Sequence, residues 1–456
     1  MKNTPSITWV NHAGYVLSYN KVNILVDPWH TGGAFNNGWK LLVDTHFPKS
    51  LKDKINYIWI SHEHPDHFSP KDIVNFPKKK NIKIIFQNTK DKRVVTFLKK
   101  KGFQIIELEN FKKLKINKNF KITIVKNDQI DSLSIFEVDD KVIINTNDCV
   151  LTDQKLKLIS KKLNIQSSDV LLTQFSYASW IGNKSDKDLR NKAAKEKLNQ
   201  ISSQIKYFKP KITIPFASYV YFSHHENKYM NDKITKLKDV KNVIYRNGSE
   251  AIFLFPGSVY NIGSDNTNKF DIDYKNYIKA FSGLHSKQYS KSESIEYLLL
   301  EKNSKEYLNK LYKKNNKIIM IFFYYLSKFS HLFFRKDFIG FSCVCIYLED
   351  IKKIVEFNWK SGLRIVHSKV KEIDISISSD SLNYIFLHEW GIGSLMINGR
   401  GSYRNMHCKW KFNRIFSLGL INSTGDNLLS KIFKKIIFVT RLSFENHEPS
   451  FLKKIK

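Results

Sequence analysis

The sequence is short of cysteine and lacks an apolar leader. Four cysteines occur among 456 residues, and they are Cys149, Cys343, Cys345 and Cys408. They are too few and too unevenly spaced for a disulfide framework, which favours a reducing compartment. Residues 1–6 contain neither the hydrophobic region nor the cleavage site of a signal peptide. Both absences predict a cytoplasmic protein.

Acidic residues are also scarce. The chain has 42 Asp and Glu against 75 Lys and Arg, and its formal net charge is +33. Such an excess indicates an anionic partner or a proteome that is strongly basic as a whole. The lysines are spread over nearly every segment instead of being gathered in one arm, which argues against nucleic acid. We therefore predict a small anionic substrate, nucleotide-linked or phosphorylated.

Long apolar runs are nearly absent. The best segment, residues 318–334, is near the lower length limit for a membrane span and is interrupted by Lys328 and His331. It is predicted as a buried or interfacial helix. Basic residues flank it on both sides, including Lys314 and Arg335, which keeps peripheral contact with the inner face of a membrane as an alternative.

The most informative stretch is a dense group of metal-binding residue types. Residues 57–60 are typical of a buried strand, and His62, His64, Asp66 and His67 follow closely. Side chains two positions apart in an extended chain point the same way, so His62 and His64 can bind one metal ion. Asp66 and His67 lie past a proline and can face a second ion. Solvated surface histidines are the alternative, but their position after an apolar strand favours a metal centre.

Length and composition predict two globular domains. An apolar fraction of 42% is ample for hydrophobic cores. The first domain, residues 1–262, begins with short antiparallel strands and continues with alternating helices and strands, a pattern typical of an α/β fold. A polar stretch at residues 261–275 is predicted to be a linker. Residues 276–456 then form a second domain of α+β type.

One aspartate outside the motif is a candidate ligand. Asp148 lies near the end of an apolar strand predicted within residues 141–149, where a buried carboxylate without a cation is costly. A structural role is the alternative, because Asp148 can cap the following helix.

The strand and its His-x-His-x-Asp-His motif resemble the signature of the metallo-β-lactamase fold superfamily. The resemblance implies an αββα sandwich and a dinuclear metal centre, with Asp148 as the bridging ligand. It also implies a third histidine for the first ion, but the matching place holds Asp128, whose alternative role is that of a turn residue after Asn127. A carboxylate there shifts the preferred metal from zinc toward iron or manganese. The last ligand is expected after the strand at residues 211–219, where either His224 or His225 fits.

Further blocks are similar to those of the CMP-N-acetylneuraminate hydroxylase family, over roughly residues 7–260. The blocks are Asp27-Pro28-Trp29 with Ala34-Phe35 and Gly38-Trp39, Asn145-Thr146-Asn147-Asp148-Cys149, and Pro215-Phe216-Ala217-Ser218-Tyr219 with Ser223-His224 and Lys228-Tyr229. This family hydroxylates the N-acetyl group of CMP-activated sialic acid and receives electrons through a Rieske domain. No Cys-x-His paired with Cys-x-x-His occurs here, so we expect no intrinsic iron–sulfur cluster and a separate electron-donor protein.

The same resemblance implies the roles of individual residues. One ion would be held by His62, His64 and Asp128, and the other by Asp66, His67 and His224. The substrate cleft would be shaped by aromatic residues and one histidine, namely Trp29, Phe35, Trp39, Tyr177, Tyr219 and His225.

The second domain has a weaker pattern. Helices are predicted at residues 295–312 and 318–334, and strands at 343–348, 373–377 and 394–397. A further helix is expected to start within residues 378–382, with a serine or an aspartate as its N-cap. The resulting strand–helix–strand order resembles sterol-carrier-like modules. This domain is expected to cover the active site, bind substrate or dimerise.

These observations predict a dinuclear-metal oxygenase that acts on a nucleotide-activated or surface-polysaccharide sugar, with iron favoured and zinc or manganese as alternatives. The competing prediction is a metal-dependent hydrolase of phosphodiesterase or nuclease type. There, two metals would lower the pKa of a bridging water and Asp66 would orient it or accept its proton, beside the bridging Asp148.

Overall fold

The computed structural model describes residues 4–77, 79–127, 130–264, 268–334, 337, 339–366 and 372–430. These residues form two compact units. The first ends at Lys291 and also includes Ile397–Gly399. The second runs from Ser292 to Met396 and resumes at Arg400.

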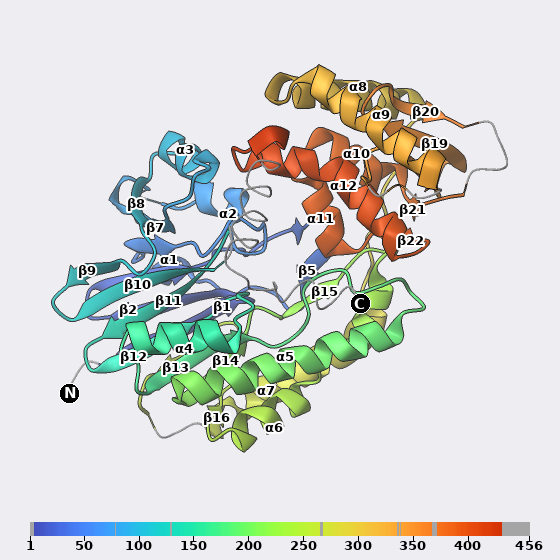
Figure 1. Cartoon of the computed structure of the whole chain (residues 1–456). Coiled ribbons are helices and arrows are strands. Elements are labelled where there is room, and N and C mark those ends of the chain that lie inside the picture. The colour runs from blue at the N-terminus through green and yellow to red at the C-terminus, as the bar shows by residue number, and fades with distance from the viewer. Residues whose placement is uncertain are drawn as a thin grey trace, which may run out of the picture. The chain divides into compact units, whose positions relative to one another are not determined.

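The first unit contains two seven-stranded sheets (Figure 1). One sheet has the order β17-β1-β2-β3-β6-β7-β8, in which β1 to β3 are antiparallel and β3, β6, β7 and β8 are parallel. Its strands are β1 (Ser6–Asn11), β2 (Gly14–Tyr19), β3 (Val22–Val26), β6 (Tyr57–Trp59), β7 (Lys83–Gln87), β8 (Gln104–Leu108) and β17 (Val259–Asn261). The short antiparallel strands predicted at the start of this domain are therefore confirmed.

The other sheet has the order β16-β14-β13-β12-β11-β10-β9. Strands β9 to β12 are antiparallel, whereas β12, β13, β14 and β16 are parallel. The strands are β9 (Lys113–Asn117), β10 (Phe120–Asn127), β11 (Asp131–Val138), β12 (Lys141–Asn145), β13 (Ser168–Gln174), β14 (Pro210–Phe216) and β16 (Glu250–Ala251).

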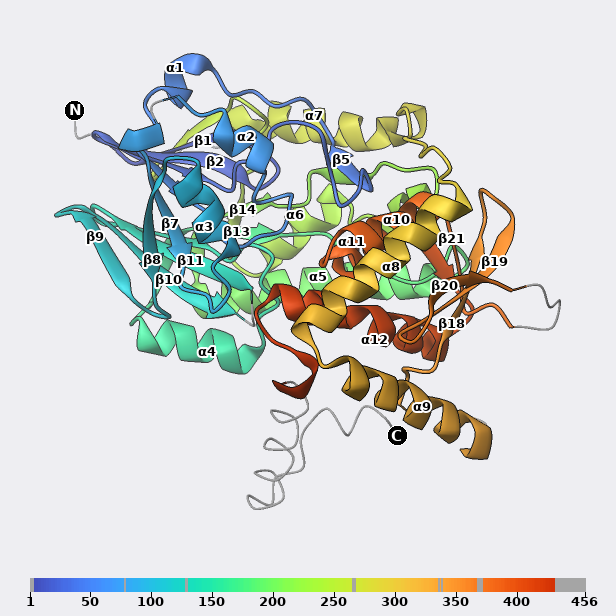
Figure 2. The same ribbon diagram turned by 90° about the horizontal axis from the view of Figure 1, so that it is seen from above.

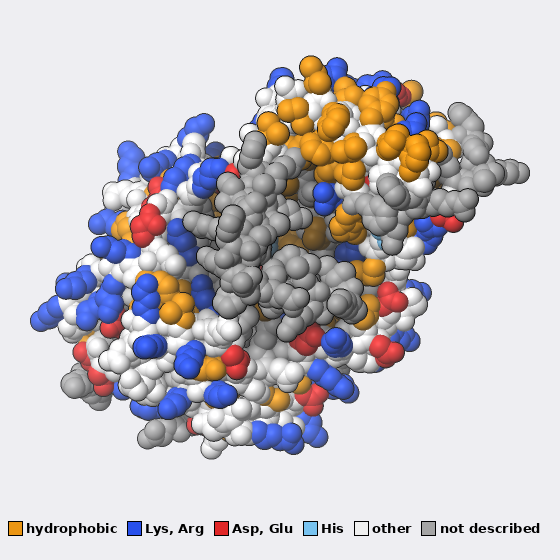
Figure 3. Space-filling model, viewed as in Figure 1, with side chains coloured by type: hydrophobic (Ala, Val, Ile, Leu, Met, Phe, Trp, Pro, Cys, Tyr) orange, Lys and Arg blue, Asp and Glu red, His pale blue; other side chains and the backbone are white. Residues whose placement is uncertain are grey.

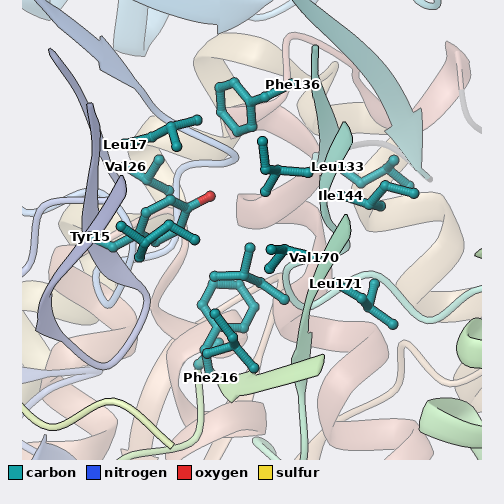
Figure 4. Close-up of a cluster of buried hydrophobic side chains, with 14 of the residues drawn as sticks. Tyr15, Leu17, Val26, Leu133, Phe136, Ile144, Val170, Leu171 and Phe216 are labelled. Atoms are coloured by element: carbon teal, nitrogen blue, oxygen red, sulfur yellow. The ribbon is translucent and has the colours of Figure 1, made fainter. Parts of the chain in front are cut away.

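The main hydrophobic core lies between the two sheets. Leu17 and Val26 of the first sheet face Phe136 and Val170 of the second (Figure 4). Alternation along a strand sends the neighbouring Val16 to the opposite face, where it packs in a second cluster. Because both faces of the first sheet carry buried apolar side chains, the outer face must also be covered by other elements.

Helices supply these outer layers, so the predicted αββα sandwich is confirmed (Figure 2). In α3, the buried Val94, Val95 and Leu98 form one apolar face that packs on the first sheet. The helices of this unit are α1 (Lys49–Lys52), α2 (Pro70–Val74), α3 (Arg93–Lys100), α4 (Asp153–Lys162), α5 (Lys187–Phe208), α6 (Leu237–Arg246) and α7 (Asp271–Ser282), with 3-10 turns η1 (Lys79–Asn81), η2 (Lys228–Lys233), η3 (Asn268–Phe270) and η4 (Gly283–Ser286).

The division between the units differs from the predicted one. Residues 261–275 were expected to be a linker, but η3 and the start of α7 lie there. Tyr277 of α7 stacks on Tyr219 with ring centroids 3.8 Å apart and donates a hydrogen bond to the Leu254 carbonyl at 3.0 Å. Because this helix packs into the first core, the first unit extends to Lys291.

The second unit has a five-stranded sheet with the order β20-β19-β18-β21-β22. Its strands are β18 (Val344–Leu348), β19 (Lys353–Asn358), β20 (Gly362–Ile365), β21 (Ile375–Ile377) and β22 (Gly401–Tyr403), and its helices include α8 (Tyr297–Lys314), α9 (Lys317–Phe334), α10 (Ser379–Leu387) and α12 (Met406–Ser423). The predicted helices at 295–312 and 318–334 and the predicted strands at 343–348 and 373–377 are confirmed. Among the described residues, no helix is long and apolar enough to cross a membrane.

The strand predicted at residues 394–397 is wrong, because α11 (Gly391–Asn398) occupies this segment. Ile392 and Leu395 are buried three positions apart, a helical spacing that a short apolar run does not distinguish from a strand. The order between β21 and β22 is therefore strand–helix–helix–strand. This differs from the pattern on which the resemblance to sterol-carrier-like modules rested.

Candidate metal centre

Asp27 ties the metal-binding loop to the sheet. It follows β3, the neighbour of β6, and its carboxylate accepts hydrogen bonds from the backbone N–H and the Oγ of Ser61, both at 2.8 Å. Ser132 Oγ donates to the Ser61 carbonyl at 2.6 Å. The loop that carries the histidines therefore starts from a fixed point between the two sheets.

These hydrogen bonds determine which nitrogen of His62 is available. Ser61 Oγ uses its only hydrogen toward Asp27, so it must accept from the Nδ1–H of His62, 2.9 Å away. The Nε2 of His62 is then unprotonated and lies 2.9 Å from Nδ1 of His64. The two imidazoles converge, as their spacing predicts.

His67 is held in the same way from the other side. Its Nδ1–H donates to Asp27 at 2.9 Å, so its Nε2 points to the centre of the site. That nitrogen lies 3.2 Å from Asp148 Oδ2 and 3.3 Å from Asp66 Oδ2. Asp27 therefore orients ligands from both halves of the motif.

The side chains form three overlapping groups that could each hold a metal ion. They are His62, His64 and Asp131; His12, Asp66 and His67; and His62, His67 and Asp148. Within each group the ligand atoms lie within 4.8 Å of one another. Each group offers two imidazoles and one carboxylate, a donor set found both in non-haem iron oxygenases and in zinc hydrolases. Because the third group shares a histidine with each of the others, Asp148 lies between them.

Burial and neighbouring charges set the protonation of these side chains. Burial, followed by the neighbouring imidazole, lowers the pKa of His62 and of His64 to about 4, so both are neutral at pH 7. Burial would also lower the pKa of His67, but Asp148 and Asp66 raise it well above its usual value. Burial would raise the pKa of Asp66, but the neighbouring charge of His67 outweighs it and holds this pKa well below its usual range.

The site also contains buried polar atoms that make no hydrogen bond among the described residues. Among the described residues, Asp66 Oδ1, Asp148 Oδ1 and both ring nitrogens of His12 make no hydrogen bond. Such groups are costly unless something satisfies them. Cations bound among these oxygen and nitrogen atoms would do so, and the donor set therefore fits two metal ions.

Sequence reasoning missed two members of these groups. His12 lies in the turn between β1 and β2, far from the motif in sequence, and no local spacing links it to a metal site. Asp131 opens β11, and its Oδ1 lies 3.9 Å from Nε2 of His62. The predicted ligand Asp128 lies outside the described residues, just before this strand.

The aromatic loop borders the metal centre. The Phe35 and His64 rings are 5.8 Å apart, and Trp39 packs on Phe35 at 4.9 Å. Trp29 lies 5.5 Å from the His12 ring, and with Tyr177 these aromatic residues form one buried cluster. A small sheet supports the loop, made of β4 (Gly33–Ala34), β5 (Trp39–Leu41) and β15 (Val220–Phe222).

The other predicted residues lie elsewhere. Tyr219 is fully buried in the main core, where its hydroxyl donates to the Pro215 carbonyl at 3.1 Å, so its contacts are those of a packing residue. His224 is buried, and its Nδ1 accepts from the Glu226 N–H at 3.2 Å. His225 is exposed beside Tyr289. Neither histidine belongs to a metal-binding group among the described residues.

One lysine faces the same centre. Lys197 of α5 contacts Gln174 Oε1, and burial lowers the pKa of its ammonium group while Asp148 opposes the shift. No sequence motif marks this lysine, because the helix brings it to the site from a distant part of the chain.

Comparisons with known proteins agree with the fold of this region. Residues 6–150 match the family model described as Beta-lactamase superfamily domain. Cytidine monophosphate-N-acetylneuraminic acid hydroxylase of Danio rerio is 26% identical over 253 residues, which cover 51% of this chain and 41% of the relative. The mouse (Mus musculus) enzyme is 27% identical over 278 residues, covering 56% and 47%. The chain therefore matches less than half the length of these relatives.

Solved structures resemble only part of this chain. CmlA, a diiron beta-hydroxylase from Streptomyces venezuelae, matches with a TM-score of 0.39 and 12% identity, over 57% of this chain and 55% of that one.

Proposed function

We propose that this chain, whose residues 6–150 form a β-lactamase superfamily domain, is a dinuclear-iron oxygenase that hydroxylates a nucleotide-activated or surface-polysaccharide sugar. The observation that carries the proposal is the three overlapping groups of two histidines and one carboxylate. Non-haem iron oxygenases use two histidines and one carboxylate, and zinc hydrolases use the same donors, so the preference for iron rests on the hydroxylase relatives.

The proposed ligands divide between two ions. His62 and His64 bind the first, together with a carboxylate for which Asp131 and the predicted Asp128 are the candidates. Asp66 and His67 bind the second with a further imidazole, for which sequence reasoning names His224. Asp148, between the two groups, is shared.

Two iron ions bound there would supply the reductive activation of dioxygen. The chain's own residues do the rest. Asp27 holds the ring of His67 and, through Ser61, that of His62, so that the Nε2 of each faces inward. Phe35 beside His64 excludes water from the reacting side. Lys197, close to Asp148, attracts the anionic part of the substrate.

The substrate and electron source follow from the relatives. Those relatives are hydroxylases of a CMP-linked sugar, and a similar nucleotide sugar or glycan precursor suits the basic chain. The low cysteine content supports a cytoplasmic location, and because no Cys-x-His paired with Cys-x-x-His occurs in the sequence, a separate electron-donor protein supplies the electrons.

Metal analysis of protein purified without added metal tests this function. We expect about two iron ions per chain, and dioxygen consumption that requires both a reductant and a CMP-activated N-acylated sugar. His64→Ala should abolish that consumption, whereas His46→Ala, which changes an exposed histidine, should not. A zinc-only protein that cleaves a generic phosphodiester without reductant would be a hydrolase and would overturn the proposal.

A further inference from the structure

The backbone around His12 is fixed from both sides. Asn11 Oδ1 accepts from the His12 N–H at 2.8 Å, and the amide of Asn11 donates to the Val43 carbonyl at 2.9 Å. The Ala217 N–H donates to the His12 carbonyl at 2.9 Å. His12 also has a φ of 47°, in the left-handed region that non-glycine residues rarely adopt. The fold therefore places this histidine at one defined position.

The ring of His12 points into the metal centre. It packs against Trp29 at 5.5 Å and His67 at 5.8 Å, and it is 1% exposed. Its Nε2 lies 3.5 Å from Asp66 Oδ2, longer than an ordinary hydrogen bond. Neither ring nitrogen has a hydrogen-bond partner among the described residues, although hydrogen bonding is the rule for buried imidazoles.

We propose that His12 is a ligand of the second metal ion and takes the place that sequence reasoning gave to His224. With Asp66 and His67 it completes a set of two imidazoles and one carboxylate, equal to the set that His62, His64 and Asp131 offer the first ion. This inference rests on the dinuclear centre of the proposed function. It does not depend on the reaction that the centre catalyses.

Cobalt(II) titration of the metal-free protein tests the proposal, because absorption bands report each bound ion without any turnover. The best variant is His12→Asn, since asparagine tolerates the left-handed backbone and removes the imidazole. We expect two cobalt sites in the natural protein. In His12→Asn the second site should be at least ~10-fold weaker and have altered bands, whereas His224→Asn should match the natural protein.

Further variants separate ligand loss from misfolding. His12→Asp returns a metal-binding donor and should recover part of the second-site affinity, and circular dichroism should show each metal-free variant folded. Two intact sites in His12→Asn, or loss of the second site in His224→Asn alone, would overturn the proposal. Two cobalt ions bound without oxygenase activity would leave it standing and count against the proposed function.

A second inference concerns α9, which exposes an apolar face on the second unit (Figure 3). Met320, Tyr324 and Ser327 are buried on its inner side. Large apolar side chains, each between 39% and 78% exposed, lie along the outer side, namely Ile318, Phe322, Tyr325, Leu326, Phe329, Leu332 and Phe333. A continuous apolar patch of this kind marks an interaction surface.

The charge of α9 indicates which kind of surface it binds. The helix contains no acidic residue, and Lys313, Lys317 and Lys328 are exposed beside or within it. Aromatic and aliphatic residues combined with lysines are typical of helices that lie in the interface of an anionic bilayer. We infer that α9 binds an anionic lipid surface with its axis parallel to the membrane.

Sedimentation with vesicles of phosphatidylcholine, with or without phosphatidylserine, tests this inference. We expect binding only to the anionic vesicles, and weaker binding as salt is raised. The double variant Phe322→Glu, Phe329→Glu should bind at least ~10-fold less. Leu158→Glu and Leu189→Glu change exposed leucines on other helices and should have no effect. Failure of the natural protein to bind, or a dimer dissociated by the double variant, would overturn the inference.

Discussion

At the scale of single residues, Asp27 organises the metal centre without being a candidate ligand. Its two carboxylate oxygens accept from Ser61, from His67 and, at 3.3 Å, from the side-chain amide of Asn147. It therefore links β3, the motif loop and the end of β12. Such outer partners set the tautomer and direction of ligating imidazoles.

We expect Asp27→Asn to weaken metal binding by ~10–100-fold, because an amide offers one acceptor where the carboxylate offers two. Competition against a coloured chelator would measure the loss. Asp44→Asn, which changes an exposed carboxylate, is the matched control. Unchanged affinity in Asp27→Asn would show that the histidines are oriented by other contacts.

Asp131 and Asp128 can be separated by their asparagine variants. Because Asp131 Oδ1 lies 3.9 Å from Nε2 of His62, we expect Asp131→Asn to reduce the metal content toward one ion per chain. Asp128→Asn should retain both ions. Metal analysis after gel filtration gives the answer, and the reverse pattern would restore the ligand inferred from the sequence alone.

Residues close together in the chain could be predicted, but those assembled by the fold could not. His62, His64, Asp66 and His67 share one loop, so their spacing was enough. His12 comes from the β1–β2 turn and Lys197 from α5, and only the packing of two sheets and a helix brings them to the loop. A residue whose partners are distant in sequence leaves no local pattern.

At the scale of elements, a helix start could be predicted where a side chain caps the helix. The helix start predicted within residues 378–382 is confirmed: Ser378 caps α10, and its Oγ accepts from the Ser381 N–H at 3.3 Å. The next helix, α11, has no such capping residue at its start, and its apolar run was read as a strand. Its burial pattern is set by tertiary packing, which a single sequence does not display.

We expect Ser378→Ala to lower the free energy of unfolding by about 1 kcal/mol, because a helix N–H loses its acceptor. The change should appear as a lower midpoint in urea with an unchanged slope. Ser378→Thr keeps the hydroxyl and should lose much less. Equal losses in both variants would assign the effect to packing around the side chain.

At the scale of the whole molecule, the first unit was predictable because one motif and several sequence blocks agree with one architecture. Its end was not, because Tyr277 joins the first core through contacts with Tyr219 and Leu254 that are distant in sequence. The polar composition of residues 261–275 described the surface of that segment and not its packing partner.

Stability of the metal-free protein should fall steeply in mild acid. Burial lowers the pKa of His30 to about 4, as it does for His62 and His64, while the unfolded chain binds these protons near pH 6.5. Between those two pH values the unfolded state binds more protons, so stability is complete above about pH 6.5 and is lost as the pH falls toward 4.

His30 isolates this effect, because it lies outside the three metal-binding groups and packs on Phe47 with ring centroids 5.0 Å apart. Protonation of His30 lowers the free energy of unfolding by as much as about 3 kcal/mol. His30→Leu keeps an apolar side chain there and has nothing to protonate, so its melting temperature should fall less between pH 7 and pH 4.5. His46→Leu, at an exposed histidine, should follow the natural protein. Identical pH profiles for His30→Leu and the natural protein would mean that His30 is protonated equally in the folded and unfolded states.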